Sequence, residues 1–218
     1  MNKILIIFIY STSIFAEYTP SSFPTKDKAY YASESNKYFD TLDTYASRDS
    51  KPKYSSHVIR WEWYPWLFLT GHRRWSLKLD RLLILYPTKV INRVCRGFDV
   101  QPFGRCHVTF HYIKGDHLVD IYEEFTFNDA GEITFIEAWT DEPGFGPTSP
   151  NDYWAEDTAV ERLSTKVPGL GSPEGRYDRK KIKELSKTDP DLKNLLKRLR
   201  FPVSFWLYEA VRFAFKRD

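Results

Sequence analysis

The stretch from Ile121 to Pro143, IYEEFTFNDAGEITFIEAWTDEP, contains seven Asp and Glu residues and no Lys or Arg. Apolar and polar residues alternate on both sides of NDAG, a pattern that is typical of two β-strands joined by a tight turn. A carboxyl group that a strand directs into an apolar interior has a raised pKa and can act as a general acid or base near neutral pH. The chemistry that this sequence can perform therefore depends on which of the acids point inward.

The turn at NDAG predicts how these two strands pair. If Asp129–Gly131 forms a three-residue loop with Gly131 in the left-handed conformation, Glu123 lies opposite Glu137. Opposite side chains are about 5 Å apart, so two ionised carboxylates would repel each other in an apolar setting. Either one of them keeps its proton, or a cation lies between them, for which the candidates are Arg93, Arg96 and Arg105. The alternative interpretation is an ion-paired or rim-exposed pair without a catalytic role.

The preceding hairpin places two histidines on the neighbouring strand. A two-residue turn at 115–116 pairs His111 with Asp120 and His107 with Glu124. Four residues of a strand span about 13 Å, so the two histidines cannot bind one metal ion. We therefore predict surface salt bridges for them and no metal site.

Both registers predict the same two faces of the sheet. The apolar face carries Val108, Phe110, Tyr112, Val119, Ile121, Phe125, Phe127, Ile133, Phe135 and Trp139. Glu123 and Glu137 lie among these residues and are the anomaly of that face. The other face is mostly polar, and Ile136 and Ala138 are its apolar exceptions.

The elements around these strands predict an α+β fold. A first helix contains Tyr31, Tyr38, Leu42 and Tyr45 and ends before Asp49, and a second spans Trp75–Tyr86. Between them lies an aromatic connector, 60–71. The period then changes to two, which predicts strands near 90–99, 105–114, 117–127 and 132–141. Further helices are predicted at 152–163, around 192–199 and over 203–216.

The N-terminus predicts export. Residues 1–16 combine Lys3, an apolar run and a small residue, Ala16, before the expected cleavage point. The uncharged run from Ile4 to Ala16 is thirteen residues, whereas a membrane span needs about 20, so a retained anchor or a buried first strand is the weaker interpretation. Export to the periplasm or secretory pathway favours a disulfide between Cys95 and Cys106, and two buried thiols are the alternative.

The charge is distributed unevenly along the chain. The segment from Arg179 to the C-terminus has twelve Lys and Arg against five Asp and Glu. It can fold onto the acidic middle of the chain, bind an anionic membrane surface, or form a solvated face. The apolar stripe within Val203–Lys216 suits the membrane interpretation, and docking of this helix on the domain's own surface is the favoured alternative. We expect no nucleic-acid partner and no cofactor, and motifs of common hydrolases, nucleotide-binding proteins and zinc proteases are missing from the sequence.

The order of these elements, closed by the strand GEITFIEAWTD (Gly131–Asp141), resembles the nuclear transport factor 2-like superfamily, particularly its SnoaL-like branch. The resemblance covers 28–148, preceded by the signal at 1–16 and a tether at 17–27. The stretch EDTAVERLSTKVPGLGSPEGRYD also resembles an extension of some members, so 149–218 forms a helical basic extension. The resemblance implies a cone: a strongly curved, mostly antiparallel sheet wrapped around its helices, with an apolar cavity.

The resemblance also implies candidate functions. Members include polyketide cyclases, ketosteroid isomerases, dehydratases and proteins that only bind a ligand or form homodimers. The first hypothesis is a pocket protein for a small apolar or aromatic molecule, with walls from Trp61, Trp63, Trp66, Tyr112, Phe135 and Trp139. The second is a cofactor-free enzyme, in which the general base maps to Glu137 or Asp141 with Glu123 as partner. The oxyanion pair of the steroid isomerases has no matching position. A third is a peripheral membrane protein that uses the basic extension.

Overall fold

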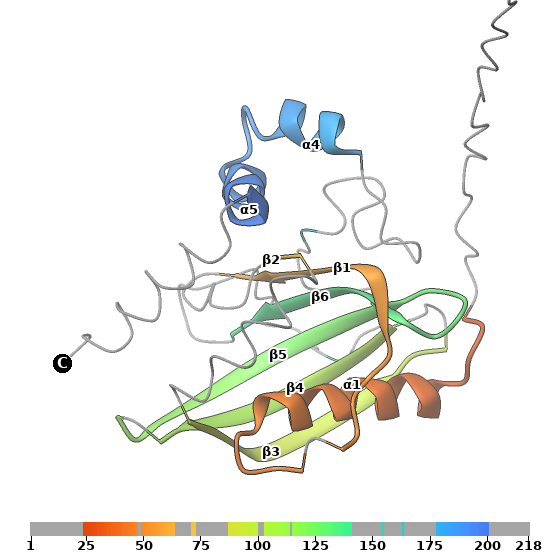
Figure 1. The fold of residues 1–218 in the computed structure, drawn as a ribbon, viewed down its shortest axis with the longest axis vertical. Helices are drawn as coiled ribbons and strands as arrows, with labels where there is room; N and C mark the ends of the chain where they lie inside the picture. The colour runs from red at the N-terminus through yellow and green to blue at the C-terminus, as the bar shows by residue number, and fades with distance from the viewer. Residues whose placement is uncertain are drawn as a thin grey trace, which may run out of the picture.

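The computed structural model describes residues 24–47, 49–63, 71–72, 87–99, 103–113, 115–140, 154, 163 and 178–200. This part of the chain is an α+β structure with one curled, mixed, six-stranded sheet and three helices (Figure 1). The predicted fold class is confirmed at this level. The predicted signal, the second helix and the helix over 203–216 lie outside the described residues, and of 152–163 only Trp154 and Leu163 are described.

The sheet has the strand order β2-β1-β6-β5-β4-β3. Its strands are β1 Tyr54–Glu62, β2 Gly71–His72, β3 Thr88–Gly97, β4 Phe103–Tyr112, β5 His117–Phe127 and β6 Ile133–Trp139. Strands β3 to β6 form an antiparallel meander at nearly the predicted positions, whereas β1 pairs in parallel with β6. Strand β1 was not predicted, and its last residues overlap the aromatic stretch 60–71 that was interpreted as a connector.

Helix α1, Lys28–Leu42, lies across β3 and β4 on one face of the sheet (Figure 1). It begins at Asp27, whose side chain caps the first turn by accepting a hydrogen bond from the Tyr30 amide. It ends earlier than predicted, and Tyr45 lies beyond it in the solvent. The close packing of the start of α1 on β3 depends on Gly97, because a Cβ atom at this position would lie 1.9 Å from the Lys28 carbonyl oxygen.

Helices α4, Arg179–Leu185, and α5, Pro190–Arg200, lie on the opposite side of the sheet from α1 (Figure 1). Helix α5 confirms the helix predicted around 192–199. The buried side chains of both helices belong to one apolar cluster with the sheet, which contains Ile59, Trp61, Trp63, Tyr122, Phe135, Trp139, Leu163, Ile182, Leu192 and Leu195. A second cluster fills the α1 side. Both faces of the sheet are therefore buried in this region.

The register of the β4–β5 hairpin differs from the prediction by two residues. Tyr112 lies opposite His117, so the loop is four residues long and both strands keep their predicted faces. The predicted pairs of the two histidines are wrong. His111 instead contacts Asp116 at 2.7 Å, and the ring of His107 lies 4.5 Å from that of Tyr122.

The register of the β5–β6 hairpin differs by one residue. Phe127 pairs with Ile133 as predicted, but a bulge follows, and Thr126 then pairs with Phe135. A shift of one residue exchanges the faces of a strand. Phe135, Glu137 and Trp139 consequently lie on the α4–α5 face, whereas the two apolar exceptions, Ile136 and Ala138, lie on the α1 face.

The predicted disulfide is present between Cys95 and Cys106. These residues lie directly opposite each other on β3 and β4, with their Cα atoms 4.1 Å apart. Such a bond is compatible with the predicted location outside the cytoplasm. Among the described residues, no helix is long and apolar enough to cross a membrane.

Candidate functional site

A cluster of charged side chains is buried on the α1 side of the sheet. Arg60 and Glu62 come from β1 and Glu123 comes from β5, and their side chains are 3%, 6% and 2% exposed. The Nε atom of Arg60 lies 3.1 Å from Oε1 of Glu62, and its Nη2 atom lies 3.6 Å from Oε1 of Glu123. One guanidinium group is therefore shared by two carboxylates.

The strand order brings these three residues together. Glu123 on β5 pairs with Ala138 on β6, and Ala138 pairs with Glu62 on β1. Side chains in one such row point to the same face of a sheet, so the small Ala138 separates the two glutamates. Arg60 lies in the neighbouring row, opposite Ile136. The cluster thus requires the parallel pairing of β1 with β6 and the bulge that turns Ala138 to this side.

Two tyrosines interact with the cluster. The guanidinium carbon of Arg60 lies 5.0 Å from the ring centroid of Tyr38, which comes from α1. Desolvation raises the pKa of the Tyr112 hydroxyl above its usual range, and the negative charges of Glu62 and Glu123 raise it further, against the opposing effect of Arg60. Tyr112 therefore remains a neutral hydrogen-bond donor at physiological pH.

The position of Glu137 corrects the central sequence prediction. Glu137 does not lie opposite Glu123 but opposite Glu124, and its side chain points to the α4–α5 face. Its Oε1 atom accepts hydrogen bonds from Trp63 Nε1, at 2.8 Å, and from the Leu163 amide. Glu137 therefore connects β6 with Trp63, directly after β1, and with the chain at 163. The proposed pair of Glu123 and Glu137 does not exist as one site.

A second buried ion pair lies on the same face as Glu137. Arg105 donates hydrogen bonds to Oε2 of Glu124 from Nε, at 3.1 Å, and from Nη2, at 2.6 Å. Its guanidinium carbon also lies 5.9 Å from the ring centroid of Trp139. The buried positive charge of Arg105 is thus neutralised by the Glu124 carboxylate and also contacts an aromatic ring. Such an arrangement is expected of an ion pair with a structural role.

The predicted pocket residues are divided between the two faces. Trp61, Trp63, Phe135 and Trp139 are buried in the cluster that holds α4 and α5, so they contribute to the packing of that layer. Tyr112 lies on the α1 side. Trp66 and Asp141 lie outside the described residues. Within the described part of the chain, no group of three His, Cys, Asp or Glu residues could hold a metal ion.

Sequence reasoning missed Tyr38, Arg60 and Glu62 as site residues. The signal was present in β1, where the sequence VIRWEW alternates charged or aliphatic residues with large apolar ones. Such alternation predicts a strand that directs Arg60 and Glu62 to one face. The family-model comparison gives no match for this chain, and the search of curated proteins gives no relative.

Proposed function

We propose that this chain is an exported protein that binds a small, largely apolar or aromatic molecule on the α1 side of its sheet. We further propose that it is a member of the SnoaL-like branch, with the cone arrangement that this implies. The curled sheet, the helix across its inner layer and the disulfide support this proposal. The observation that carries it is the cluster of Arg60, Glu62 and Glu123 beside an apolar core of aliphatic and aromatic side chains.

Burial of charge is costly, and apolar residues of similar size would stabilise the same position as well or better. A cluster of two carboxylates and one arginine therefore indicates a role beyond packing. Its carboxylates can accept hydrogen bonds from a ligand hydroxyl or amine, while Tyr112 can donate one to a ligand carbonyl. The surrounding rings of Tyr38 and Phe125, whose centroids are 4.9 Å apart, provide apolar contacts for the rest of the molecule.

The test is native mass spectrometry of the protein purified from its own host. The wild type is expected to retain a small molecule, and Glu123→Gln is expected to retain it at least about tenfold less, because one charge-assisted hydrogen bond contributes about 1.5–3 kcal/mol. Glu184→Gln removes a carboxylate from the exposed side of α4 and is the matched control. Equal retention by all three proteins contradicts the proposal.

A second candidate is a cofactor-free enzyme of the cyclase, isomerase or dehydratase type. The consideration in its favour is that the charges of two buried carboxylates, Glu62 and Glu123, act on the Tyr112 hydroxyl and help to raise its pKa. In this variant of the proposal, Glu123 replaces Glu137 as the base that removes a proton next to a carbonyl, and Tyr112 donates a hydrogen bond to the developing enolate. Exchange of that proton for deuterium in the retained molecule, lost in Glu123→Gln, would distinguish catalysis from binding alone.

A further inference from the structure

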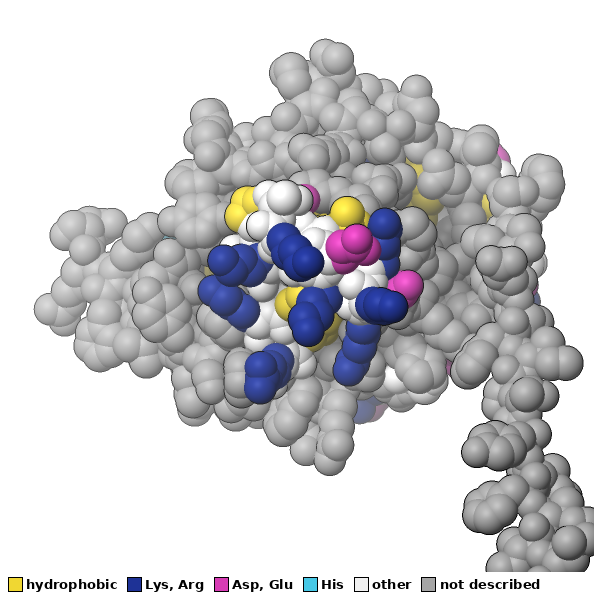
Figure 2. Space-filling model, turned by 90° about the horizontal axis from the view of Figure 1, so that it is seen from above, with side chains coloured by type: hydrophobic (Ala, Val, Ile, Leu, Met, Phe, Trp, Pro, Cys, Tyr) yellow, Lys and Arg dark blue, Asp and Glu magenta, His cyan; other side chains and the backbone are white. Residues whose placement is uncertain are grey.

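Helices α4 and α5 present a strongly basic surface. The segment from Asp178 to Arg200 contains nine Lys and Arg against four Asp and Glu. Eight of the basic side chains are exposed, and we define them as the basic face: Arg179, Lys180, Lys181, Lys183, Lys187, Lys193, Lys197 and Arg200. Figure 2 shows these side chains gathered on the side of the molecule that α4 and α5 form, with few acidic groups among them.

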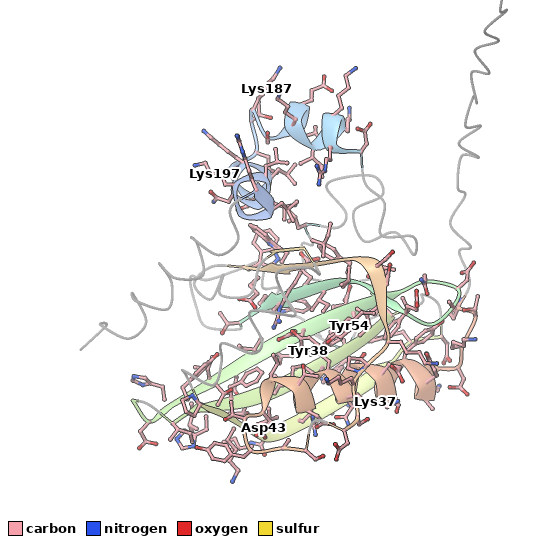
Figure 3. All side chains as sticks on the ribbon, in the orientation of Figure 1. Lys37, Tyr38, Asp43, Tyr54, Lys187 and Lys197 are labelled. Carbon is pink, nitrogen blue, oxygen red and sulfur yellow. A yellow bond between two sulfur atoms is a disulfide. The ribbon has the colours of Figure 1, made fainter. Side chains whose placement is uncertain are left out.

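The packing of the two helices fixes this surface toward the solvent. Ile182, Leu192 and Leu195 are fully or almost fully buried in the cluster that contains the tryptophans of β1 and β6. The apolar sides of α4 and α5 are thus occupied by the sheet. Lys187 and Lys197 point away from the sheet (Figure 3). The face is therefore held by a packed core rather than by a loose tail.

Two of the four acidic residues of this segment cap its helices. The carboxylate of Asp178 caps α4 by accepting hydrogen bonds from the amides of Lys180 and Lys181. The carboxylate of Asp189 accepts hydrogen bonds from the amides of Asp191 and Leu192 in the same way at α5. Among the described residues, no ion pair involves the seven basic side chains from Arg179 to Lys197 in this face. Their charge is available to an external partner.

We propose that the basic face binds the anionic headgroups of a phospholipid bilayer. Six of its eight residues are lysines, which interact as point charges and suit a fluid surface of phosphates better than a fixed pattern of bidentate contacts. The segment from Asp178 to Arg200 has no aromatic residue on which a nucleic-acid base could stack. Because the apolar sides of the helices are buried, the attraction is electrostatic and decreases with salt.

The sequence that follows α5 agrees with a bilayer as the partner. The chain continues as FPVSFWLYEAVRFAFKRD, in which Val203, Trp206, Leu207, Ala210, Val211 and Ala214 have the spacing of an amphipathic helix. Tryptophan and other aromatic residues are favoured at the boundary between headgroups and acyl chains. The aromatic segment, which also carries Arg212, Lys216 and Arg217, thus follows the basic face along the chain.

The test is co-sedimentation of the full chain with phosphatidylcholine vesicles that contain or lack about 30 mol % phosphatidylglycerol, at about 0.1 M salt. Binding is expected only with phosphatidylglycerol and is expected to decrease at higher salt. In Lys187→Glu/Lys193→Glu/Lys197→Glu the partition coefficient should fall at least about a hundredfold, because each of the three basic residues contributes about a fivefold factor near an anionic surface. Equal binding by this variant and the wild type overturns the proposal.

A matched control distinguishes the effect of the basic face from the effect of the net charge of the protein. Lys26→Glu/Lys51→Glu/Lys89→Glu makes the same change of charge at exposed positions on other parts of the molecule. It should change the partition coefficient by less than about tenfold, because exposed charges beyond a Debye length are screened. Equal losses in the two variants overturn the proposal.

A second outcome would also overturn it. If the wild type binds a single-stranded oligonucleotide more tightly than vesicles, and Lys187→Glu/Lys193→Glu/Lys197→Glu loses that binding, the basic face is assigned to nucleic acid. Equal thermal unfolding midpoints check that both variants are folded.

Discussion

The two faces of the sheet bury the same kinds of charged residue in different geometries. On the α4–α5 face, Arg105 binds one carboxylate, that of Glu124, through two hydrogen bonds of 3.1 and 2.6 Å. On the α1 face, Arg60 is shared between the carboxylates of Glu62 and Glu123, at 3.1 and 3.6 Å. The α4–α5 face also holds a second carboxylate, Glu137 opposite Glu124, which accepts hydrogen bonds from Trp63 and the Leu163 amide instead of sharing the arginine. On the α1 face both carboxylates share one arginine, and one of the two contacts is longer.

This difference distinguishes a structural pair from a candidate binding site. Short, two-point contacts between opposite charges are what a buried pair needs to offset its desolvation. Groups that serve a ligand are arranged for the ligand, and their replacement commonly costs little stability or increases it. The α4–α5 face is accordingly a core that attaches the C-terminal helices, and the α1 face is the place to test for function.

The largest expected effect is on the α4–α5 face. Arg105→Ala removes the guanidinium that Glu124 contacts and leaves a carboxylate in a buried position. The free energy of unfolding, measured by urea denaturation, should decrease by about 3–5 kcal/mol. Arg93→Ala is the control, because Arg93 contacts Asp40 at 2.7 Å in a partly exposed position, where about 0–1 kcal/mol is expected. Similar losses in both variants would contradict the assignment of Arg105 to a structural pair.

An intermediate effect should separate two neighbouring glutamates. Glu124→Gln weakens the charged hydrogen bonds to Arg105 and should lower the free energy of unfolding by about 1.5–3 kcal/mol. Glu123→Gln relieves the proximity of two acids around Arg60, so its effect should be within about 1 kcal/mol or stabilising. Urea denaturation of both variants at one pH provides the comparison. The reverse order would show that Glu123 belongs to the structural core and Glu124 does not.

The origin of these two faces explains how far the sequence could predict them. The turn itself was predicted correctly: the Asn128 amide donates to the Glu132 carbonyl, and Gly131 has a φ of 78°. The bulge one residue later was not predicted, because all seven residues of β6 are buried, including the polar Thr134 and Glu137, so polarity does not distinguish an outer face of this strand. Without a bulge, the predicted register placed the apolar residues Ile136 and Ala138 on the polar face. These two exceptions were the signal that the register was wrong by one residue.

The remaining errors come from contacts that are distant in the sequence. In the β4–β5 hairpin the loop is two residues longer than assumed, but an even shift keeps every side chain on its face. The pairing of β1 with β6 joins residues more than seventy positions apart, and nothing in the local pattern of Arg60 or Glu62 specifies that partner. Local alternation therefore predicted the meander and Glu123, whereas the other two charged members of the cluster required the tertiary fold.

The smallest expected effect concerns Tyr112 and alkaline pH. The pKa of its hydroxyl is raised in the folded protein by desolvation and by the charges of Glu62 and Glu123, whereas the unfolded chain has the ordinary value near 10. Above that pH the unfolded state loses this proton before the folded state does, so the free energy of unfolding decreases as pH rises, by at most about 1.4 kcal/mol per pH unit. Below it, the stability contributed by this group is fully present.

Tyr112→Phe should therefore unfold with a weaker dependence on pH above about 10 than the wild type, with little change at neutral pH. Tyr45→Phe, at an exposed position, controls for the loss of one tyrosine. Because Glu123 contributes to the raised pKa, Glu123→Gln should also move the ionisation of Tyr112, followed by ultraviolet difference absorption, toward lower pH. The same substitution in Glu137 should leave it unchanged, since that carboxylate lies on the other face of the sheet. A shift caused equally by both glutamates would mean that the sheet does not separate the two sites electrostatically.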